Sequence, residues 1–151
     1  METELEGALE YWYLHGSNEP NRGQNPAAGA PFTQVVPGTV EWEVVSVSFT
    51  YTASAAAANR VPLIRFLDQG GRAFGEFGVP FNITANNHSR VTFGVYANQF
   101  GANNSARMGT SIPCYKIGDG VSFEVTADAA DAADQISDVA FFVRQWPIRL
   151  G

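Results

Sequence analysis

Hydrophobic and polar residues alternate most regularly along residues 40–52, which we interpret as the first long β-strand of the chain. On one face lie Val45, Val47, Phe49 and Tyr51, and on the other lie Ser46, Ser48 and Thr50. A period of two is the mark of a strand with one buried face. Trp42 and Val44 have the opposite parity, so the alternation changes between Val44 and Val45. One extra residue there restores it, which predicts a β-bulge.

The rest of the chain after residue 52 repeats this strand pattern and contains no convincing helix. Further strands are predicted over residues 61–67, 73–79, 90–97, 107–115, 121–125 and 136–146. Turn-forming stretches separate them, such as residues 68–72, where paired glycines favour a hairpin turn. Pro113 interrupts the strand 107–115, which indicates a sheet edge. Many short strands with turns between them are typical of a β-sandwich or barrel.

The first and last of these strands are the longest, which favours a jelly roll. We therefore expect an all-β protein, a jelly-roll β-sandwich of about eight strands. The terminal strands of such a domain are usually neighbours, so residues 45–51 should lie beside residues 139–146. Central positions in alternating strands are held by Phe49, Phe93, Phe123 and Phe141, and we expect these four to share one core.

The last strand is hydrophobic on both faces. Val139, Phe141 and Val143 share one face, and Ala140, Phe142 and Trp146 share the other. If the first face packs into the sandwich, Phe142 and Trp146 point outward, where large aromatic residues usually mark an interaction site. Identical subunits bury such a patch through closed symmetry. We therefore expect a homo-oligomer with Phe142 and Trp146 at its interface, a trimer rather than a dimer; cover by the N-terminal arm is the competing explanation.

Residues 1–36 differ from the strand-forming part, and we expect an extended N-terminal arm there, followed by the sandwich domain at 37–151. The arm starts with an apolar patch and continues without any period, rich in Pro, Gly and Asn. Such a stretch buries too little apolar surface to offset its ordering entropy alone. We expect it to lie across a neighbouring protein and to be dispensable for folding; a disordered tail whose aromatic residues fold back on the parent domain is the alternative. Its expected contact residues are Leu9, Tyr11, Trp12, Tyr13, Arg22 and Phe32.

The composition supports a surface that other proteins cover. Of 151 residues, 45% are hydrophobic and 16% charged, where about 25% charged is usual; a monomer rich in Asn, Ser and Thr is the alternative. A net charge of −6 with Lys116 as the only lysine argues against nucleic acid as a partner. No apolar run approaches the length of a membrane span. The acidic first residues and the single cysteine, Cys114, fit synthesis in a reducing cytoplasm.

Residues that commonly carry catalysis are sparse, and we expect no enzyme, no metal and no cofactor. His15 and His88 are the two histidines, too few for the metal set of double-stranded β-helix enzymes, and no nucleophile-elbow, phosphate-loop or zinc motif occurs. The carboxylates that could converge as a catalytic pair are Glu41, Glu43, Glu76 and Glu124, but outward strand positions explain them more simply. Asp128, Asp131 and Asp134 predict a solvated acidic loop; a cation or a basic partner that relieves their charge is the alternative.

Asn59 and Arg60 follow a run of alanines and precede the strand 61–67. An Asn in such a turn can hydrogen-bond its own backbone, and an Arg can bridge to a carboxylate of a facing loop. Our first interpretation is therefore that Asn59 and Arg60 have a structural role at the rim of the sandwich. Contact with another subunit is the second interpretation, which adds Asn59 and Arg60 to the candidate oligomer interface.

Four segments carry a resemblance to a known family: Trp42 with residues 45–50, residues 58–60, residues 63–71 and residues 134–146. Together they resemble the jelly-roll decoration, or cement, proteins of tailed bacteriophage heads. The resemblance covers 40–68 and 134–146. It implies a small β-sandwich on the outer surface of a virion, made in the host cytoplasm, that clamps neighbouring major capsid subunits and acts as an oligomer. A carbohydrate-binding or adhesion module on a virion fibre or tail, with Trp12, Tyr96, Phe100 or Trp146 as stacking platforms, is the alternative function.

Overall fold

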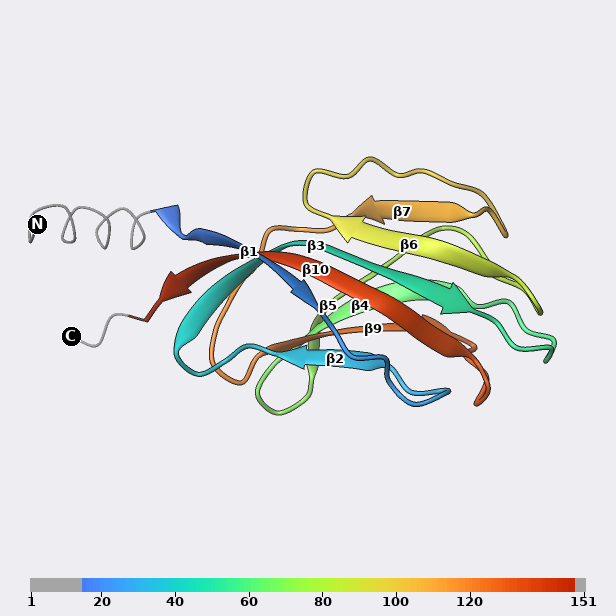
Figure 1. Cartoon of the computed structure of the whole chain (residues 1–151), viewed down its shortest axis with the longest axis horizontal. Coiled ribbons are helices and arrows are strands. Elements are labelled where there is room, and N and C mark those ends of the chain that lie inside the picture. Colours follow the sequence, from blue (N-terminus) through green and yellow to red (C-terminus); the bar gives the residue numbers. More distant parts are fainter. Residues whose placement is uncertain (1–14, 149–151) are drawn as a thin grey trace, which may run out of the picture.

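A computed structural model describes residues 15–148, and within this range ten strands form two packed sheets (Figure 1). The six-stranded sheet has the order β1 (Ser17–Arg22), β10 (Gln135–Pro147), β3 (Val40–Thr52), β6 (His88–Gly94) and β7 (Arg107–Ser111), and the short β8 (Lys116–Ile117) also pairs with β3. The four-stranded sheet has the order β2 (Phe32–Val35), β9 (Ser122–Asp128), β4 (Val61–Leu67) and β5 (Ala73–Gly78). The predicted all-β sandwich is confirmed.

The two longest strands, β3 and β10, lie side by side, as predicted for the terminal strands of a jelly roll. The strands that follow and precede them, β4 and β9, pair in the opposite sheet. One feature differs from a purely antiparallel roll, because β6 runs parallel to β7. The predicted bulge is confirmed as well: Phe142 pairs with Ser46 and Val143 with Val44, so Val45 is the extra residue on β3.

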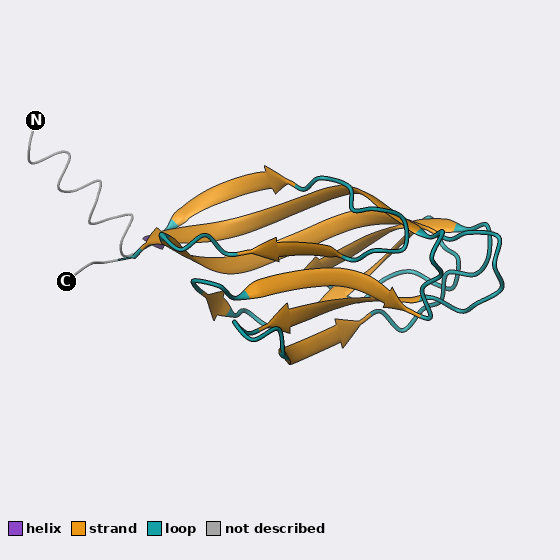
Figure 2. Cartoon of the chain, turned by 90° about the horizontal axis from the view of Figure 1, so that it is seen from below, coloured by secondary structure: helices purple, strands orange, loops and turns teal. Residues whose placement is uncertain are grey.

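One hydrophobic core fills the space between the two layers of strands (Figure 2). Phe49, Phe93, Phe123 and Phe141 all belong to it, which confirms the predicted shared core. The ring centroids of Phe123 and Phe141, from opposite sheets, are 5.3 Å apart. Both described ends of the chain lie at the same end of the sandwich (Figure 2).

The described part of the predicted arm is built into the sandwich. β1 pairs with β10, and β2 pairs with β9, so the boundary expected at residue 36 does not separate an arm from a domain in residues 15–36. Phe32, expected to contact a capsid, is 6% exposed and packs against Phe123 and Phe141. Removal of residues 1–36 would therefore take away two strands and the core side chains of Phe32 and Val36, so the expectation that they are dispensable for folding is not retained. The expected contact residues Leu9, Tyr11, Trp12 and Tyr13 lie outside the described residues.

Ser89 is a polar residue inside this core. Its side chain is fully buried, and its hydroxyl oxygen has no hydrogen-bond partner among the residues that the structure describes. A buried hydroxyl without a partner costs about 1–3 kcal/mol. We expect Ser89→Ala to raise the free energy of unfolding by about 1 kcal/mol in urea titrations. Ser48→Ala is the matched control, because the Ser48 hydroxyl oxygen lies 3.1 Å from that of Thr92; equal destabilisation by both changes would show that Ser89 has a partner.

Candidate interaction surface

The outer face of the six-stranded sheet carries the aromatic side chains that the sequence predicts to point outward. Directly paired residues of neighbouring strands place their side chains on the same face. The resulting rows are Arg22–Ala140–Ser48, Pro20–Phe142–Ser46 and Asn18–Arg144–Glu43, running from β1 across β10 to β3. Val139, Phe141 and Val143 are buried on the inner face, whereas Phe142 and Trp146 are partly exposed on the outer one. The predicted division of β10 into two faces is confirmed.

Phe142 lies in a shallow, open trough between β1 and β3. A concavity of about 540 Å³ is lined by Pro20, Asn21, Arg22, Ser46, Ser48, Ala140, Phe141 and Phe142. Most of these side chains are small, and Arg22 at its margin is the single formal charge among them. The trough is open rather than enclosed, so it suits a protruding side chain of another protein better than a small molecule that must be surrounded.

Trp146 lies further along β10, near the ends of the described chain, and contacts of its own chain fix its ring. The Lys116 ammonium is 4.5 Å from the ring centroid, a cation–π contact, and 3.3 Å from a Glu41 carboxylate oxygen. A Cβ at Gly16, which has a φ of +72°, would approach ring atom Cε2 to 2.9 Å, so this position requires glycine. Trp146 therefore presents a positioned, partly exposed ring on the same sheet face as Phe142.

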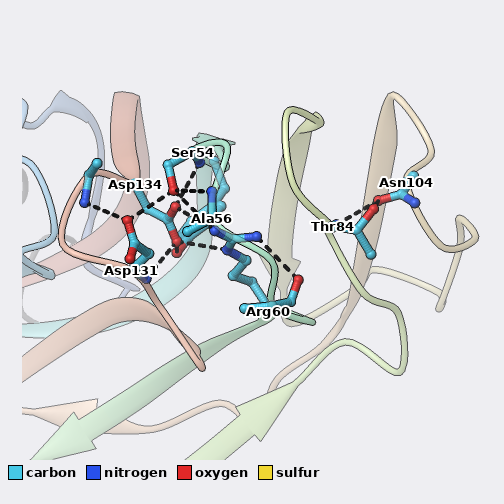
Figure 3. Close-up of polar contacts among 10 residues, drawn as sticks. Ser54, Ala56, Arg60, Thr84, Asn104, Asp131 and Asp134 are labelled. Atoms are coloured by element: carbon cyan, nitrogen blue, oxygen red, sulfur yellow. Dashed lines mark hydrogen bonds and ion pairs between the residues drawn. The ribbon is translucent and has the colours of Figure 1, made fainter.

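Arg60 is fully buried and does not lie at any surface. Its Nε donates to Oδ2 of Asp134 at 3.0 Å, and its Nη2 donates to Oδ1 at 3.1 Å (Figure 3). The interpretation of Arg60 as a bridge to a carboxylate of a facing loop is confirmed, and its assignment to an oligomer interface is wrong, because a side chain with 0% exposure has nothing left to offer a partner. Asn59 is exposed, and its interface role stays a prediction.

Asp134 forms the centre of a network that joins the loop after β3 to the loop after β9. Besides Arg60, it accepts hydrogen bonds from the Ser54 N–H at 2.8 Å and from the Asp131 N–H at 2.9 Å (Figure 3). It also accepts a hydrogen bond from the Tyr51 hydroxyl at 2.6 Å. Ser54 Oγ donates in turn to Asp131 at 2.9 Å. Asp134 is only 3% exposed, so the predicted solvated acidic loop is wrong at this position; a basic partner, Arg60 of the same chain, relieves the charge.

These contacts set the protonation of the network. Burial opposes ionisation of Asp134, but the hydrogen bonds from Ser54, Tyr51, Asp131 and Arg60 outweigh it and hold the pKa of this carboxyl well below its ordinary value. Burial, followed by the hydrogen bond to Asp134, raises the pKa of the Tyr51 hydroxyl. A carboxylate and a phenol stabilised in these forms hold structure and are not poised for proton transfer near pH 7.

Three of the four candidate catalytic carboxylates, Glu41, Glu76 and Glu124, are engaged in ion pairs. Glu76 and Glu124 both contact Arg65, at 3.0 and 3.5 Å, and Glu41 contacts Lys116. Among residues 15–148, no three or more His, Cys, Asp or Glu side chains gather where they could hold a metal ion, and no helix is long and apolar enough to cross a membrane. Cys114 is exposed, and partial desolvation followed by a hydrogen bond with Glu43 raises the pKa of its thiol. A raised thiol pKa leaves less thiolate, the reactive form.

Comparison with known proteins finds one weak structural similarity and no related sequence. No protein-family model matches the chain, and no curated protein matches it. Among solved structures, a chain in a structure of infectious bursal disease virus, Gt strain, aligns with a TM-score of 0.31 and 12% sequence identity over 87% of this chain. The alignment covers 31% of the viral chain, so this chain spans about a third of its length. This similarity is weak.

Proposed function

We propose that this chain is a non-enzymatic structural protein of a virion, which decorates the outer surface of the shell and clamps neighbouring major capsid subunits. The observation that carries the proposal is the outer face of the six-stranded sheet, where Phe142 lies in an open trough of small side chains and Trp146 lies nearby. Protein interfaces are enriched in aromatic residues and depleted of charge at their centre. The resemblance of residues 40–68 and 134–146 to phage decoration proteins supports the same role.

Such a protein would act mechanically. Each contact with the shell can be modest, because an oligomer that engages several capsid subunits at once binds with a high effective concentration. The Arg60–Asp134 network fixes two rim loops, and one core joins the sheets, so the sandwich is suited to transmit load rather than to yield. Copies linked across subunit boundaries would then resist the pressure of the packaged genome.

The surface predicts that the full chain forms a homo-oligomer, a trimer in preference to a dimer. Replacing Phe142 and Trp146 together by Ser removes both outward aromatic residues, and we expect the mass in sedimentation equilibrium to fall. Tyr96→Ser is the matched control, since Tyr96 is an aromatic residue with 83% exposure in the loop after β6. A double variant that keeps the wild-type mass would contradict the interface, as would a monomeric wild type.

The capsid role is tested on the particle itself. In the virus that encodes this chain, mass spectrometry of purified particles should find it in numerous copies per shell. Particles lacking it should release their genome at lower temperature, and purified wild-type chain added back should restore the release temperature, whereas the Phe142→Ser, Trp146→Ser variant should restore less. Absence of the chain from purified particles would reject the proposal.

A carbohydrate-binding function is the competing proposal and rests on Tyr96 and Phe100, which are 83% and 41% exposed in the β6–β7 loop. Trp146 stands on β10 and already packs against Lys116, while Trp12 lies outside the described residues. Binding of the purified chain to a glycan array decides between the two functions. Glycan binding that Tyr96→Ser abolishes would favour the carbohydrate-binding function over the capsid role. If no glycan binds, the carbohydrate-binding function is rejected.

A further inference from the structure

Four strands lie at the ends of the two sheet orders and therefore have one side without a neighbouring strand: β1, β7, β2 and β5. β8 also pairs with one strand alone, β3, but it has only two residues. An open edge presents unpaired N–H and C=O groups and pairs readily with another strand unless something blocks it. The contacts along each edge show which of the four remains available.

The two edges of the six-stranded sheet are blocked. In β1, the Gly23 N–H donates to the Val139 carbonyl at 2.9 Å, so by alternation Asn18 and Pro20 direct their backbone groups outward, and Pro20 has no N–H to donate. In β7, Gly109 exchanges both backbone hydrogen bonds with Phe100 of the preceding loop, each at 3.0 Å. A further strand could not extend this sheet without displacing these contacts.

At one edge of the four-stranded sheet, β2 has few free backbone groups with which another strand could pair. It has four residues, and the side-chain amide of Gln34 donates to the carbonyl of Val35 at 2.9 Å. Short edge strands and side chains that occupy backbone groups are the usual means of preventing edge-to-edge association.

β5 carries none of these devices between Gly75 and Gly78; its one irregularity, a β-bulge with Phe74 as the extra residue, lies before that segment. The strand has six residues without Pro or Lys, and none of the six is buried. The Val79 N–H donates to the Pro62 carbonyl at 3.1 Å, and antiparallel pairs alternate, so Phe77 and Gly75 direct their backbone groups to β4 while Glu76 and Gly78 direct theirs outward. No residue among 15–148 hydrogen-bonds with these outward groups.

The side chains of β5 also suit a close neighbour. Phe74 is 47% exposed, with its ring centroid 5.4 Å from that of Tyr115 and 6.2 Å from that of Phe66. Glu76 is the only charged residue of the strand, and its carboxylate lies 3.0 Å from the Arg65 guanidinium of the same chain. The edge therefore combines open backbone groups, a half-exposed aromatic ring and no uncompensated charge.

We propose that β5 pairs antiparallel with β5 of a second copy of this chain, so that two four-stranded sheets continue across a two-fold axis. An antiparallel edge offers the same alternation of donors and acceptors when the partner is rotated by 180°, which makes it complementary to itself. Because Arg65, which also contacts Glu124, lies 3.0 Å from Glu76, the edge does not need an opposite charge from a different protein, and the repulsion between the Glu76 carboxylates of two copies is reduced. This contact is independent of the Phe142 and Trp146 surface, which belongs to the other sheet.

Cross-linking tests the contact directly. In a Cys114→Ser background, at least one of Glu76→Cys and Gly78→Cys should form a covalent dimer with a short bismaleimide reagent. A two-fold axis that pairs the outward backbone groups of these residues passes within one residue of at least one of them, and each residue of displacement separates the two copies by about 7 Å along the strand. Asn18→Cys, an exposed residue on the blocked β1 edge, is the matched control and should remain monomeric on a denaturing gel; all three Cys variants also carry Phe142→Ser and Trp146→Ser, because Asn18 shares the sheet face of these two aromatic residues. Absence of dimers for both β5 variants would overturn the proposal.

A second variant separates this contact from the proposed oligomer surface. A Cβ at Gly78 would have no neighbour closer than 3.5 Å, so Gly78→Lys fits the fold while it places a charge at the edge. In the Phe142→Ser, Trp146→Ser background we expect a dimer. Gly78→Lys should raise its dissociation constant at least tenfold, and Asn18→Lys should leave it unchanged. Both variants should keep the melting temperature of the parent protein when it is measured at a concentration at which the protein is monomeric. A protein that is monomeric in that background before Gly78 is changed contradicts the β5 contact, whether or not the Phe142 surface proves correct.

Discussion

Replacing Asp134 by Asn is expected to lower the free energy of unfolding by about 3–5 kcal/mol at pH 7, because it leaves a buried guanidinium without its counter-charge. The Arg60 side chain is 0% exposed and donates two hydrogen bonds to the carboxylate. The Asn side chain also cannot accept all the bonds that Tyr51, Ser54 and Asp131 now donate. Urea unfolding followed by tryptophan fluorescence measures the change.

A double variant identifies the cause of this loss. Arg60→Met with Asp134→Leu removes both charges together, and replacing a buried ion pair by apolar residues of similar volume is often far less costly than breaking it. We expect the double variant to be more stable than Asp134→Asn alone. If it is less stable, the loss comes from the Tyr51 and Ser54 hydrogen bonds rather than from the unpaired charge.

The free energies of unfolding of the wild type and of Asp134→Asn should differ less in acid than at pH 7. The folded pKa of Asp134 lies well below the value of about 3.9 expected in the unfolded chain. A depressed carboxyl pKa contributes stability that is fully present above the unfolded pKa and is lost as the pH falls below it towards the folded pKa. The stability difference between wild type and Asp134→Asn should therefore be constant from pH 7 to 5 and narrow towards pH 2. A constant difference down to pH 2 would show that the carboxylate is not specifically stabilised.

Most strands that the sequence predicts correctly have a buried face; the edge strand β5, predicted over residues 73–79, is an exception without a buried residue. Residues 40–52 and 61–67 alternate or are strongly apolar, and β3 and β4 have those bounds. β1 and β2 were not predicted, because a strand at a sheet edge is held by backbone hydrogen bonds and needs no hydrophobic period. Phe32 in β2 carried the only signal, a large apolar residue in a stretch that otherwise reads as a loop, and it belongs to the core.

The candidate site could be predicted only where it depends on strand parity. Phe142 and Trp146 lie on the outward face because Val139, Phe141 and Val143 occupy the inward one, and parity is visible in a sequence. Arg60 and Asp134 are 74 residues apart, and their pairing depends on how two loops meet at the rim. Sequence reasoning predicted a carboxylate partner for Arg60 but not which one, since periodicity says nothing about the path of a loop.

Two adjacent phenylalanines provide the sharpest test of the two-faced strand. Phe141 is 5% exposed, and its ring lies between those of Trp42 and Phe123, at centroid distances of 5.9 and 5.3 Å. Phe141→Ala should lower the free energy of unfolding by about 3–5 kcal/mol, because it removes apolar contact and leaves a cavity between the sheets. Phe142 points to the other face, into the open trough.

Phe142→Ala is therefore the matched control, with the same chemical change one residue along the same strand. We expect it to change the free energy of unfolding of the isolated subunit by less than about 1 kcal/mol, since a partly exposed side chain loses little burial, while it weakens the oligomer in sedimentation. Phe141→Ala should instead cause a large loss of unfolding free energy. Both variants are unfolded in urea at a protein concentration low enough to dissociate the oligomer. Equal destabilisation by the two substitutions under those conditions would mean that Phe142 is buried within its own subunit, and the outward surface on which the proposed function depends would be lost.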